Sequence, residues 1–249
     1  MNRLEGKVAF VTGAGGGVGS AVCQRFLDEG ARVVAVDIDI DKATASVKDA
    51  LAEGRAIALK CDVSQPDEVE AAIAQAVATF GSLNVLCSPH GGSSTRDGRV
   101  TEAALEEFWR VIGVDLFGTL LVSRFGIPHL EEAGGGSVIN FASIVGLMAI
   151  SERDFYTAAK GGIISSTRSI AAGYAATGIR VNAIAPGLTL SPRVAARAST
   201  ERSKKLQDRH LLGVLQPVDI AEMAVYLASD ESKRVTGQVL TVDSGITIT

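Results

Sequence analysis

The sequence predicts a single α/β domain over residues 1–249, in which helices cover both faces of a doubly wound parallel sheet of about seven strands. Short apolar runs rich in β-branched residues recur along the chain, and segments with helical spacing separate them. The runs are continuously apolar rather than alternating, which is typical of strands buried on both faces of a parallel sheet. The apolar share of 47% and the charged share of 21% suit an ordinary globular domain.

Each strand is expected where such a run occurs, and the connections between strands are expected to be right-handed helical crossovers. Helical spacing is clearest at Pro66–Phe80 and Leu105–Val122. Ser64 is the expected cap of the first of these helices, with Pro66 in its first turn. The seven strands are expected at Lys7–Thr12, Arg32–Asp37, Ala56–Cys61, Leu83–Ser88, Ser137–Phe141, Arg180–Ala185 and Gln238–Val242.

The segment Leu188–Leu215 interrupts this alternation, since it separates a strand ending at Ala185 from a helix starting near Pro217. Ligands of α/β sheets bind outside the carboxyl ends of the strands, so a helical excursion from such an end is expected to cover a ligand. Six of its side chains are basic and two are acidic. This surplus favours an anionic substrate held by Arg193, Arg197, Arg96 or Arg99, although a solvated face or a cover over cofactor phosphates explains it equally simply.

Composition excludes several classes of protein. With 24 basic and 28 acidic side chains, the net charge of −4 argues against nucleic-acid binding. The three cysteines form no CxxC pair, so neither a disulfide framework nor a metal site is expected. No signal-peptide pattern and no run of 18 apolar residues is seen, which favours a cytoplasmic protein without a membrane span.

A glycine-rich loop follows the first strand and leads into a helix that begins near Val18. Glycines let the backbone turn tightly and approach a pyrophosphate, whose charge is stabilised at a helix N-terminus. A merely flexible turn would have the same composition, but its position between a strand and a helix favours a nucleotide site. The residues expected to bind the cofactor there are Gly13, Gly16, Gly17, Val18 and Gly19.

Asp37 ends the second strand, where a carboxylate can accept hydrogen bonds from both ribose hydroxyls of adenosine and would repel a 2′-phosphate. Gly16 offers no basic side chain for that phosphate. Both observations favour NAD over NADP. Asp62 and Val63, after the third strand, fit contacts with the adenine ring, and an ordinary helix-start turn is the alternative.

Ser143, Tyr156 and Lys160 predict the reacting site. Tyr156 and Lys160 are four residues apart, so on a helix they share a face. A free phenol has a pKa near 10 and is a poor base at neutral pH, but an adjacent ammonium favours the phenolate. Ser143 would hold the substrate oxygen, and Tyr156 would transfer the proton while a cofactor carries hydride.

In these features and in several further motifs, the whole chain resembles the short-chain dehydrogenase/reductase family, which implies a Rossmann-type fold. The resemblance implies that Tyr156 is the base or acid and that Lys160 contacts the cofactor. It also implies cofactor contacts at Gly91, Tyr156, Pro186, Gly187 and Thr189. The implied assembly is a homotetramer built on the helices near Phe117–Leu130 and Asp154–Ala175 and on the C-terminal segment. The matching motifs are TGxxxGxG at Thr12–Gly19, Asn140–Ser143, YxxxK at Tyr156–Lys160, NAxxPG at Asn182–Gly187, Val235–Gln238 and Val242–Gly245.

Two positions depart from the family pattern. Where the family has Asn-Asn-Ala-Gly, this chain has Ser88-Pro89-His90-Gly91, so a titratable group replaces a methyl. Where the family has an asparagine that binds a relay water, this chain has Asp115, whose charge would pair with Lys160 and weaken the effect of that lysine on Tyr156. His90 is either part of an altered relay, near the substrate, or a packed loop residue.

These features together predict an NAD-dependent oxidoreductase acting on a secondary alcohol or ketone of a small, cyclic or hydroxylated substrate. One alternative is an NADPH-dependent 3-oxoacyl-carrier-protein-type ketoreductase, which Asp37 disfavours. The other is a nucleotide-binding sensor with low turnover, which only Pro89, His90 and Asp115 support. The sequence does not identify the alcohol or the physiological direction of the reaction.

Overall fold

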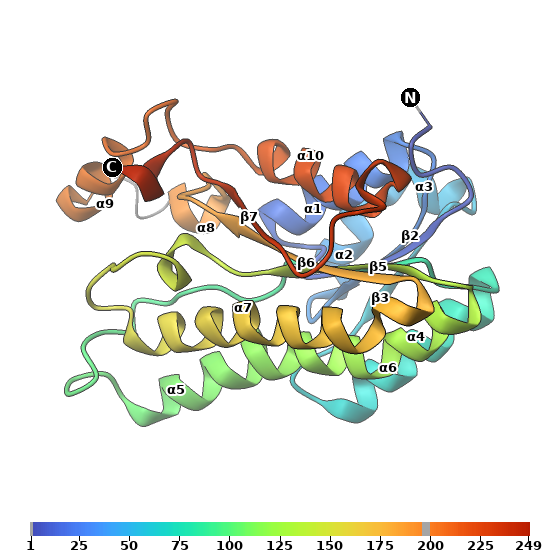
Figure 1. Cartoon of the computed structure of the whole chain (residues 1–249), viewed down its shortest axis with the longest axis horizontal. Coiled ribbons are helices and arrows are strands. Elements are labelled where there is room, and N and C mark those ends of the chain that lie inside the picture. The colour runs from blue at the N-terminus through green and yellow to red at the C-terminus, as the bar shows by residue number, and fades with distance from the viewer. Residues whose placement is uncertain (1, 196–199) are drawn as a thin grey trace.

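The computed structural model describes residues 2–195 and 200–249, and their strands form one parallel sheet, as predicted (Figure 1). The strand order is β3-β2-β1-β4-β5-β6-β7. Each predicted strand is present, with ends that differ from the expected ones by at most two residues. The strands are β1 (Val8–Thr12), β2 (Arg32–Asp37), β3 (Ala56–Lys60), β4 (Val85–Ser88), β5 (Gly136–Phe141), β6 (Ile179–Pro186) and β7 (Val239–Val242).

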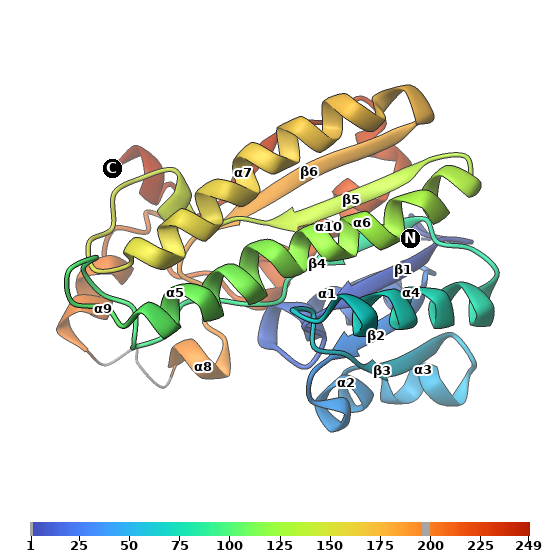
Figure 2. The same ribbon diagram turned by 90° about the horizontal axis from the view of Figure 1, so that it is seen from below.

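Helices cover both faces of the sheet (Figures 1 and 2). On one face lie α1 (Gly17–Asp28) and α10 (Pro217–Ala228), and on the other lie α4 (Pro66–Phe80), α6 (Gly118–Glu132) and α7 (Asp154–Tyr174). The remaining helices are α2 (Ile40–Ser46), α3 (Lys48–Ala52), α5 (Leu105–Val111), the π-helical turn η1 (Ile112–Phe117), α8 (Pro192–Ala195) and α9 (Glu201–Gln207). Short 3₁₀ turns occur at Ile144–Gly146 (η2), Ala175–Thr177 (η3), Asp230–Ser232 (η4) and Ile246–Ile248 (η5).

Alternate residues of the central strands enter separate apolar cores on the two faces of the sheet. On β1, Ala9 and Val11 pack toward α1 and α10, while Val8 and Phe10 pack toward α4 and α6. All five β1 residues are buried, because a strand in the middle of this sheet has helices over both of its faces. Burial on both faces explains why the strands are continuously apolar in the sequence.

The chain reverses its direction across the sheet between β1 and β4. It moves outward from β1 to β3, then returns to place β4 beside β1 on the other side. Loops at the carboxyl ends of these neighbouring strands therefore diverge and leave a crevice, which is where ligands bind in open α/β sheets.

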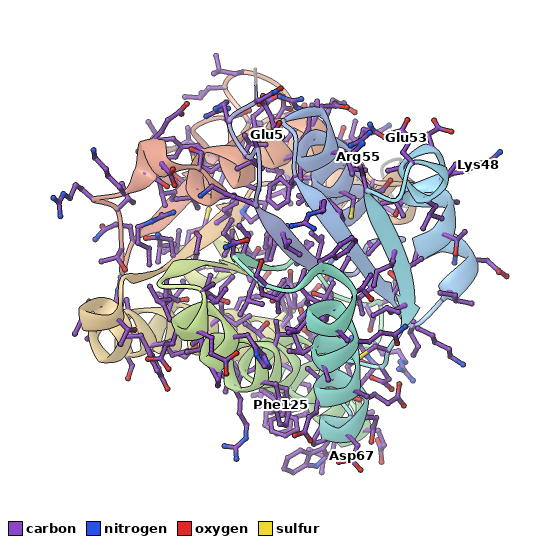
Figure 3. The ribbon with its side chains drawn as sticks, turned by 90° about the vertical axis from the view of Figure 1, so that its right-hand side faces the viewer. Glu5, Lys48, Glu53, Arg55, Asp67 and Phe125 are labelled. Atoms are coloured by element: carbon purple, nitrogen blue, oxygen red, sulfur yellow. The ribbon has the colours of Figure 1, made fainter. Side chains whose placement is uncertain are left out.

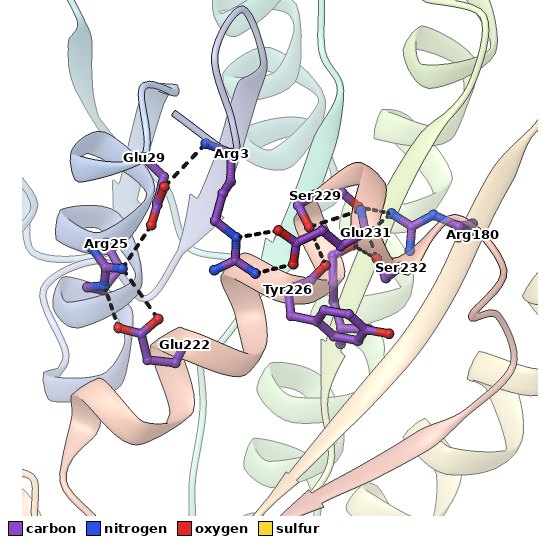
Figure 4. Close-up of polar contacts among 10 residues, drawn as sticks. Arg3, Arg25, Glu29, Arg180, Glu222, Tyr226, Ser229, Glu231 and Ser232 are labelled. Atoms are coloured by element: carbon purple, nitrogen blue, oxygen red, sulfur yellow. Dashed lines mark hydrogen bonds and ion pairs between the residues drawn. The ribbon is translucent and has the colours of Figure 1, made fainter. Parts of the chain in front are cut away.

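The N-terminal residues are attached to α10 and η4 by ion pairs (Figure 4). Arg25 on α1 donates through Nε to Glu222 of α10 at 2.7 Å, and Arg3 donates through Nε to Glu231 at 2.9 Å. These pairs are partly exposed, so each adds little to the free energy of unfolding.

Three local expectations can be compared with the structure. The cap predicted at Ser64 is wrong: Gln65 occupies the cap position, and the Ser64 hydroxyl donates to Asp62 Oδ1 at 2.7 Å instead. The helix expected at Leu105–Val122 continues to Glu132, interrupted by the π-helical turn. The cysteines Cys23, Cys61 and Cys87 are all buried and form no disulfide.

The helical stretch Leu105–Glu132 is, by length and composition, also apolar enough to span a membrane. Half of its most apolar window is buried inside the protein, and the core helix of a globular domain passes the same test. The expected lack of a membrane partner stays a prediction.

Candidate active site

Two adjoining cavities lie at the carboxyl edge of the sheet. The larger, of about 600 Å³, lies over the glycine-rich loop, and the smaller, of about 220 Å³, lies beside Ser143, Tyr156 and Lys160. Both are lined by Val18, Pro89, His90, Gly91 and Ser191, so the two spaces meet. A molecule bound over the loop can therefore reach the smaller cavity.

The larger cavity contains the predicted cofactor residues and fits a dinucleotide. Gly16 caps α1 without any side-chain hydrogen bond, and the first turn of α1 holds no acidic residue. The backbone amide groups in the first turn of α1 are thus suited to binding a pyrophosphate. A Cβ at Gly19 would overlap the carbonyl oxygen of Gly13, so the tight loop requires glycine there. The predicted residues that line this cavity are Gly13, Gly16, Gly17, Val18, Gly19, Asp37, Asp62, Val63 and Gly91.

Asp37 fixes the loop as well as facing the cavity. Its Oδ2 accepts a hydrogen bond from the Gly15 amide at 2.9 Å, and its Oδ1 accepts one from the Asp39 amide at 3.0 Å. Because each carboxylate oxygen has two acceptor sites, these bonds are compatible with further bonds from ribose hydroxyls.

The residues lining the larger cavity that were not predicted include Ile38, Lys42 and Arg110. Ile38 has an exposed fraction of 61%, which leaves an apolar surface for a purine ring to cover. Lys42 lies beside Asp37 but pairs with Asp39, the nitrogen and oxygen being 2.8 Å apart. Arg110 also lines this cavity. Ile38 could have been inferred from its place directly after Asp37.

Tyr156 and Lys160 stand one turn apart on α7, and both line the smaller cavity with Ser143. The ammonium nitrogen of Lys160 lies 5.5 Å from the centre of the Tyr156 ring and donates to the carbonyl oxygen of Phe141 at 2.8 Å. Ser143 follows β5 in extended backbone, and its Oγ accepts from the Val145 amide at 3.4 Å. The three predicted catalytic side chains are therefore brought together.

Asp115 lies behind this group on the π-helical turn and is fully buried. Its Oδ1 is 2.9 Å from Lys160 Nζ and also accepts from the Gly92 amide at 2.9 Å. Its Oδ2 is buried without a hydrogen-bond partner among the described residues. A Cβ at Gly91, where φ is +97°, would clash with this carboxylate. Asp115 thus joins the loop after β4 to the lysine.

His90 packs between β1 and α6. Its Nδ1 lies 2.5 Å from Thr12 Oγ1, and its Nε2 lies 3.4 Å from Thr119 Oγ1. Burial, and then the charge of Lys160, lower the pKa of His90 to about 4, so the ring is neutral at physiological pH. His90 borders both cavities, but its two ring nitrogens face the threonines. This geometry favours a packed loop residue over a proton relay.

The turn after β6 is held by a histidine that the sequence did not single out. The Leu188 amide donates to His210 Nε2 at 3.0 Å, and His210 Nδ1 lies 2.8 Å from the Leu206 carbonyl oxygen. His210 thereby joins this turn to the end of α9. The predicted cofactor residues Pro186, Gly187 and Thr189 line the smaller cavity.

The structure supports no contact between the cavities and the four arginines expected to bind an anionic substrate, as far as it describes them. Arg197 lies outside the described residues, as does the side chain of Arg193 in α8. Arg96 pairs with Glu107 at 3.3 Å and Arg99 with Glu102 at 3.6 Å. Neither Arg96 nor Arg99 lines the smaller cavity.

Among the side chains that the structure describes, the arginine that lines it is Arg153, at the start of α7. Within residues 2–195 and 200–249, no group of three or more His, Cys, Asp or Glu side chains could hold a metal ion.

Together, the dinucleotide-type cleft and the serine, tyrosine and lysine beside it define a nicotinamide-dependent oxidoreductase. A family model described as enoyl-(acyl carrier protein) reductase matches residues 13–247. This chain belongs to the short-chain dehydrogenase/reductase family.

Similar proteins include the cis-4-hydroxycyclohexanecarboxylate dehydrogenase of Sinomonas cyclohexanicum, which is 36% identical over 97% of this chain and 96% of that protein. The cyclohexanol dehydrogenase of an Acinetobacter species (strain SE19) is 35% identical over 99% of this chain and 97% of its own length. A solved short-chain type dehydrogenase/reductase from Mycobacterium ulcerans superposes with a TM-score of 0.93, at 29% identity, over 98% of this chain and 91% of that chain.

The ion pair between Asp115 and Lys160 predicts an altered pH dependence. In Asp115→Asn the amide oxygen can still accept from Gly92, but a negative charge beside Lys160 is lost. The phenolate of Tyr156 is then favoured, and the acidic limb of the kcat/KM profile for alcohol oxidation should move down by about one pH unit. The measurement is kcat/KM from pH 5 to pH 10, with Asp49→Asn on α3 as an exposed control; a profile equal to the control contradicts the prediction.

The buried neutral His90 predicts a loss of stability in acid. Its pKa is lower in the folded chain, about 4, than the usual 6.5, so the unfolded chain binds the proton more tightly. The contribution of neutral His90 to the free energy of unfolding is therefore complete above pH 6.5. It falls by roughly 3 kcal/mol as the pH drops to 4. Urea unfolding at pH 7 and pH 4 should show a smaller acid loss in His90→Gln than in the wild type, and equal losses would refute the assignment.

Proposed function

We propose that this chain is an NAD-dependent dehydrogenase that transfers hydride between NAD(H) and a secondary alcohol or the corresponding ketone of a small, cyclic or hydroxylated substrate. The observation that carries the proposal is that the cavity over the glycine-rich loop adjoins the cavity lined by Ser143, Tyr156 and Lys160. The two share a wall formed by Val18, Pro89, His90, Gly91 and Ser191. Bound there, the nicotinamide ring supplies the hydride acceptor or donor.

The side chains of this chain supply binding and proton transfer. Ser143 donates a hydrogen bond to the substrate oxygen, and Tyr156 accepts the hydroxyl proton during oxidation or returns it during reduction. Lys160, held by Phe141 and Asp115, keeps its positive charge next to the Tyr156 ring and favours the phenolate. The negative charge of Asp115 beside Lys160 offsets part of this stabilisation of the phenolate.

The preference for NAD rests on Asp37. Its carboxylate lies at the end of β2, beside the loop, and a 2′-phosphate would bring a second negative charge against it. Lys42 also lines this cavity, and its pairing with Asp39 reduces its attraction for such a phosphate.

The preference for a cyclic alcohol draws on the relatives. Two of them are named for six-membered ring alcohols, one of which also carries a carboxylate. The smaller cavity, of about 220 Å³, has apolar side chains at Ile144, Val145 and Ile150 that suit such a ring. A cytoplasmic location remains part of the proposal and agrees with three buried cysteines that form no disulfide.

The activity test is the appearance of NADH when the protein is mixed with NAD and cyclohexanol. Tyr156→Phe should lower kcat by at least about 100-fold, because the group that takes the proton is lost. Tyr174→Phe, at the other end of α7, is the matched control and should keep wild-type activity.

The same assay tests the cofactor. Wild type should prefer NAD to NADP, and Asp37→Asn, which keeps an acceptor for Gly15, should narrow that preference by about tenfold or more. Preference of the wild type for NADP would reject NAD and favour a carrier-protein ketoreductase. No turnover with either cofactor over a panel of alcohols and ketones would favour a nucleotide-binding sensor.

We also propose a homotetramer built on α6, α7 and the C-terminal segment. Not all apolar side chains of these two helices are available to an interface, because Leu121, Ala159, Ile163, Ile164 and Ala171 are buried in the core of the single chain. An apolar surface remains at Phe117, which is 43% exposed, and in a groove lined by Leu120, Phe125, Ile170 and Tyr174. Phe125 lies at the outer edge of the helical layer (Figure 3).

Light scattering at micromolar concentration should give about four times the chain mass of 25.8 kDa, because burying this surface removes apolar area from water. A mass of 25.8 kDa would reject the assembly.

A further inference from the structure

The smaller cavity has a positive wall. Among the described residues that line it, Arg153 and Lys160 are cationic and none is a carboxylate. Lys160 has its counter-ion, Asp115, behind the cavity wall. Because the whole chain carries a net charge of −4, this local sign is the reverse of the average. An anionic group entering the cavity therefore meets favourable charge.

Arg153 stands close to the reacting group in the chain and in space. It is the residue before α7, three positions ahead of Tyr156 in the first turn of that helix. Both side chains line the same cavity. A substrate whose hydroxyl is held at Ser143 and Tyr156 can thus extend toward the guanidinium.

The guanidinium is positioned by a chain of polar contacts. Arg153 Nη1 donates to the Ser94 carbonyl oxygen at 3.2 Å, and the Ser94 hydroxyl donates to Glu107 Oε1 at 2.6 Å. Arg110 binds both oxygens of Glu107, at 2.6 and 2.9 Å, and holds the pKa of that buried carboxyl at about 2. Glu107 is thus matched by Arg110, and it fixes Ser94 as an anchor for Arg153.

The remaining lining defines the shape of a matching ligand. Ile144, Val145, Ile150, Val194 and Leu206 offer apolar contacts. We propose that Arg153 is a specificity-determining residue that binds a carboxylate on the substrate, so that the preferred substrates are hydroxy or keto acids with an apolar ring between the two groups. This inference rests on the proposed function, and a planar guanidinium is the side chain best suited to a carboxylate.

The anion site is thus at Arg153, and not in the basic 188–215 segment or at Arg96 or Arg99. The competing role for Arg153 is purely structural, because its bond to Ser94 also ties the loop after β4 to α7. A structural role would affect all substrates equally, whereas carboxylate binding affects only those that carry the anion.

The test compares cis-4-hydroxycyclohexanecarboxylate with cyclohexanol, which share a ring and a carbinol and differ in the carboxylate. Wild type should prefer the acid by about tenfold or more in kcat/KM, since a charge-assisted bidentate contact is worth that factor. In Arg153→Gln, kcat/KM for the acid should fall about 10- to 100-fold, and that for cyclohexanol by less than about threefold. Lys48→Gln, an equal charge change at an exposed residue of α3 (Figure 3), should change neither.

Equal losses on both substrates in Arg153→Gln, or no preference of the wild type for the acid, would overturn the proposal. Arg153→Lys should recover part of the acid activity, since it restores charge without the bidentate geometry.

A binding measurement separates this inference from the proposed function. Cyclohexanecarboxylate has no carbinol and cannot react, so its affinity for the protein saturated with NADH, measured by calorimetry, is independent of turnover. The affinity should fall at least about tenfold in Arg153→Gln, while cyclohexanecarboxamide binds both proteins alike.

If the carboxylate binds through Arg153 but no alcohol is oxidised, the dehydrogenase proposal fails and the anion site stands. If cyclohexanol is oxidised but the carboxylate binds no better than the amide, the anion site fails and the dehydrogenase proposal stands.

Discussion

The buried ion pair of Lys160 and Asp115 is the interaction on which the rest of the site depends. Each charge alone would be costly at this depth, so each requires the other. Asp115 also accepts from Gly92, and Lys160 donates to Phe141. The pair therefore joins the loop after β4, the end of β5, the π-helical turn and α7, and it leaves Tyr156 in a defined place.

The parallel sheet explains how residues that are far apart in the sequence meet at one site. All of its strands end at one edge, so the loops after β1, β4, β5 and β6 converge there although they are far apart in the sequence. Residues that bind the cofactor and residues that transfer the proton arise on different loops. The contact between the cavities then follows from the position of β4 beside β1.

Sequence reasoning located the strands and proposed site residues that the structure brings together, because the signals for both are local. A continuous apolar run depends only on neighbours in the chain, and the Tyr156–Lys160 spacing depends only on one helix. Two features that the sequence did not reveal depend on long-range partners. Asp97 accepts from the Tyr156 amide, 59 positions away, and so caps α7 from a loop that no local pattern could place. Arg153 likewise donates to the Ser94 carbonyl oxygen, 59 positions away, and lines the smaller cavity, whereas Arg96 and Arg99 pair with acidic side chains nearby in the sequence.

The π-helical turn in Leu105–Glu132 changes the direction in which the residues on either side of it face. In an uninterrupted α-helix each residue advances by about 100° around the axis, so the first and last parts of the helix would keep one fixed phase. The wider turn at Ile112–Phe117 shifts that phase. Glu107 can therefore face the loop after β4 while Leu121 and Leu130 face the sheet. Deleting one residue of this turn would restore regular winding, but it would rotate either the active-site end or the core end of the helix out of alignment.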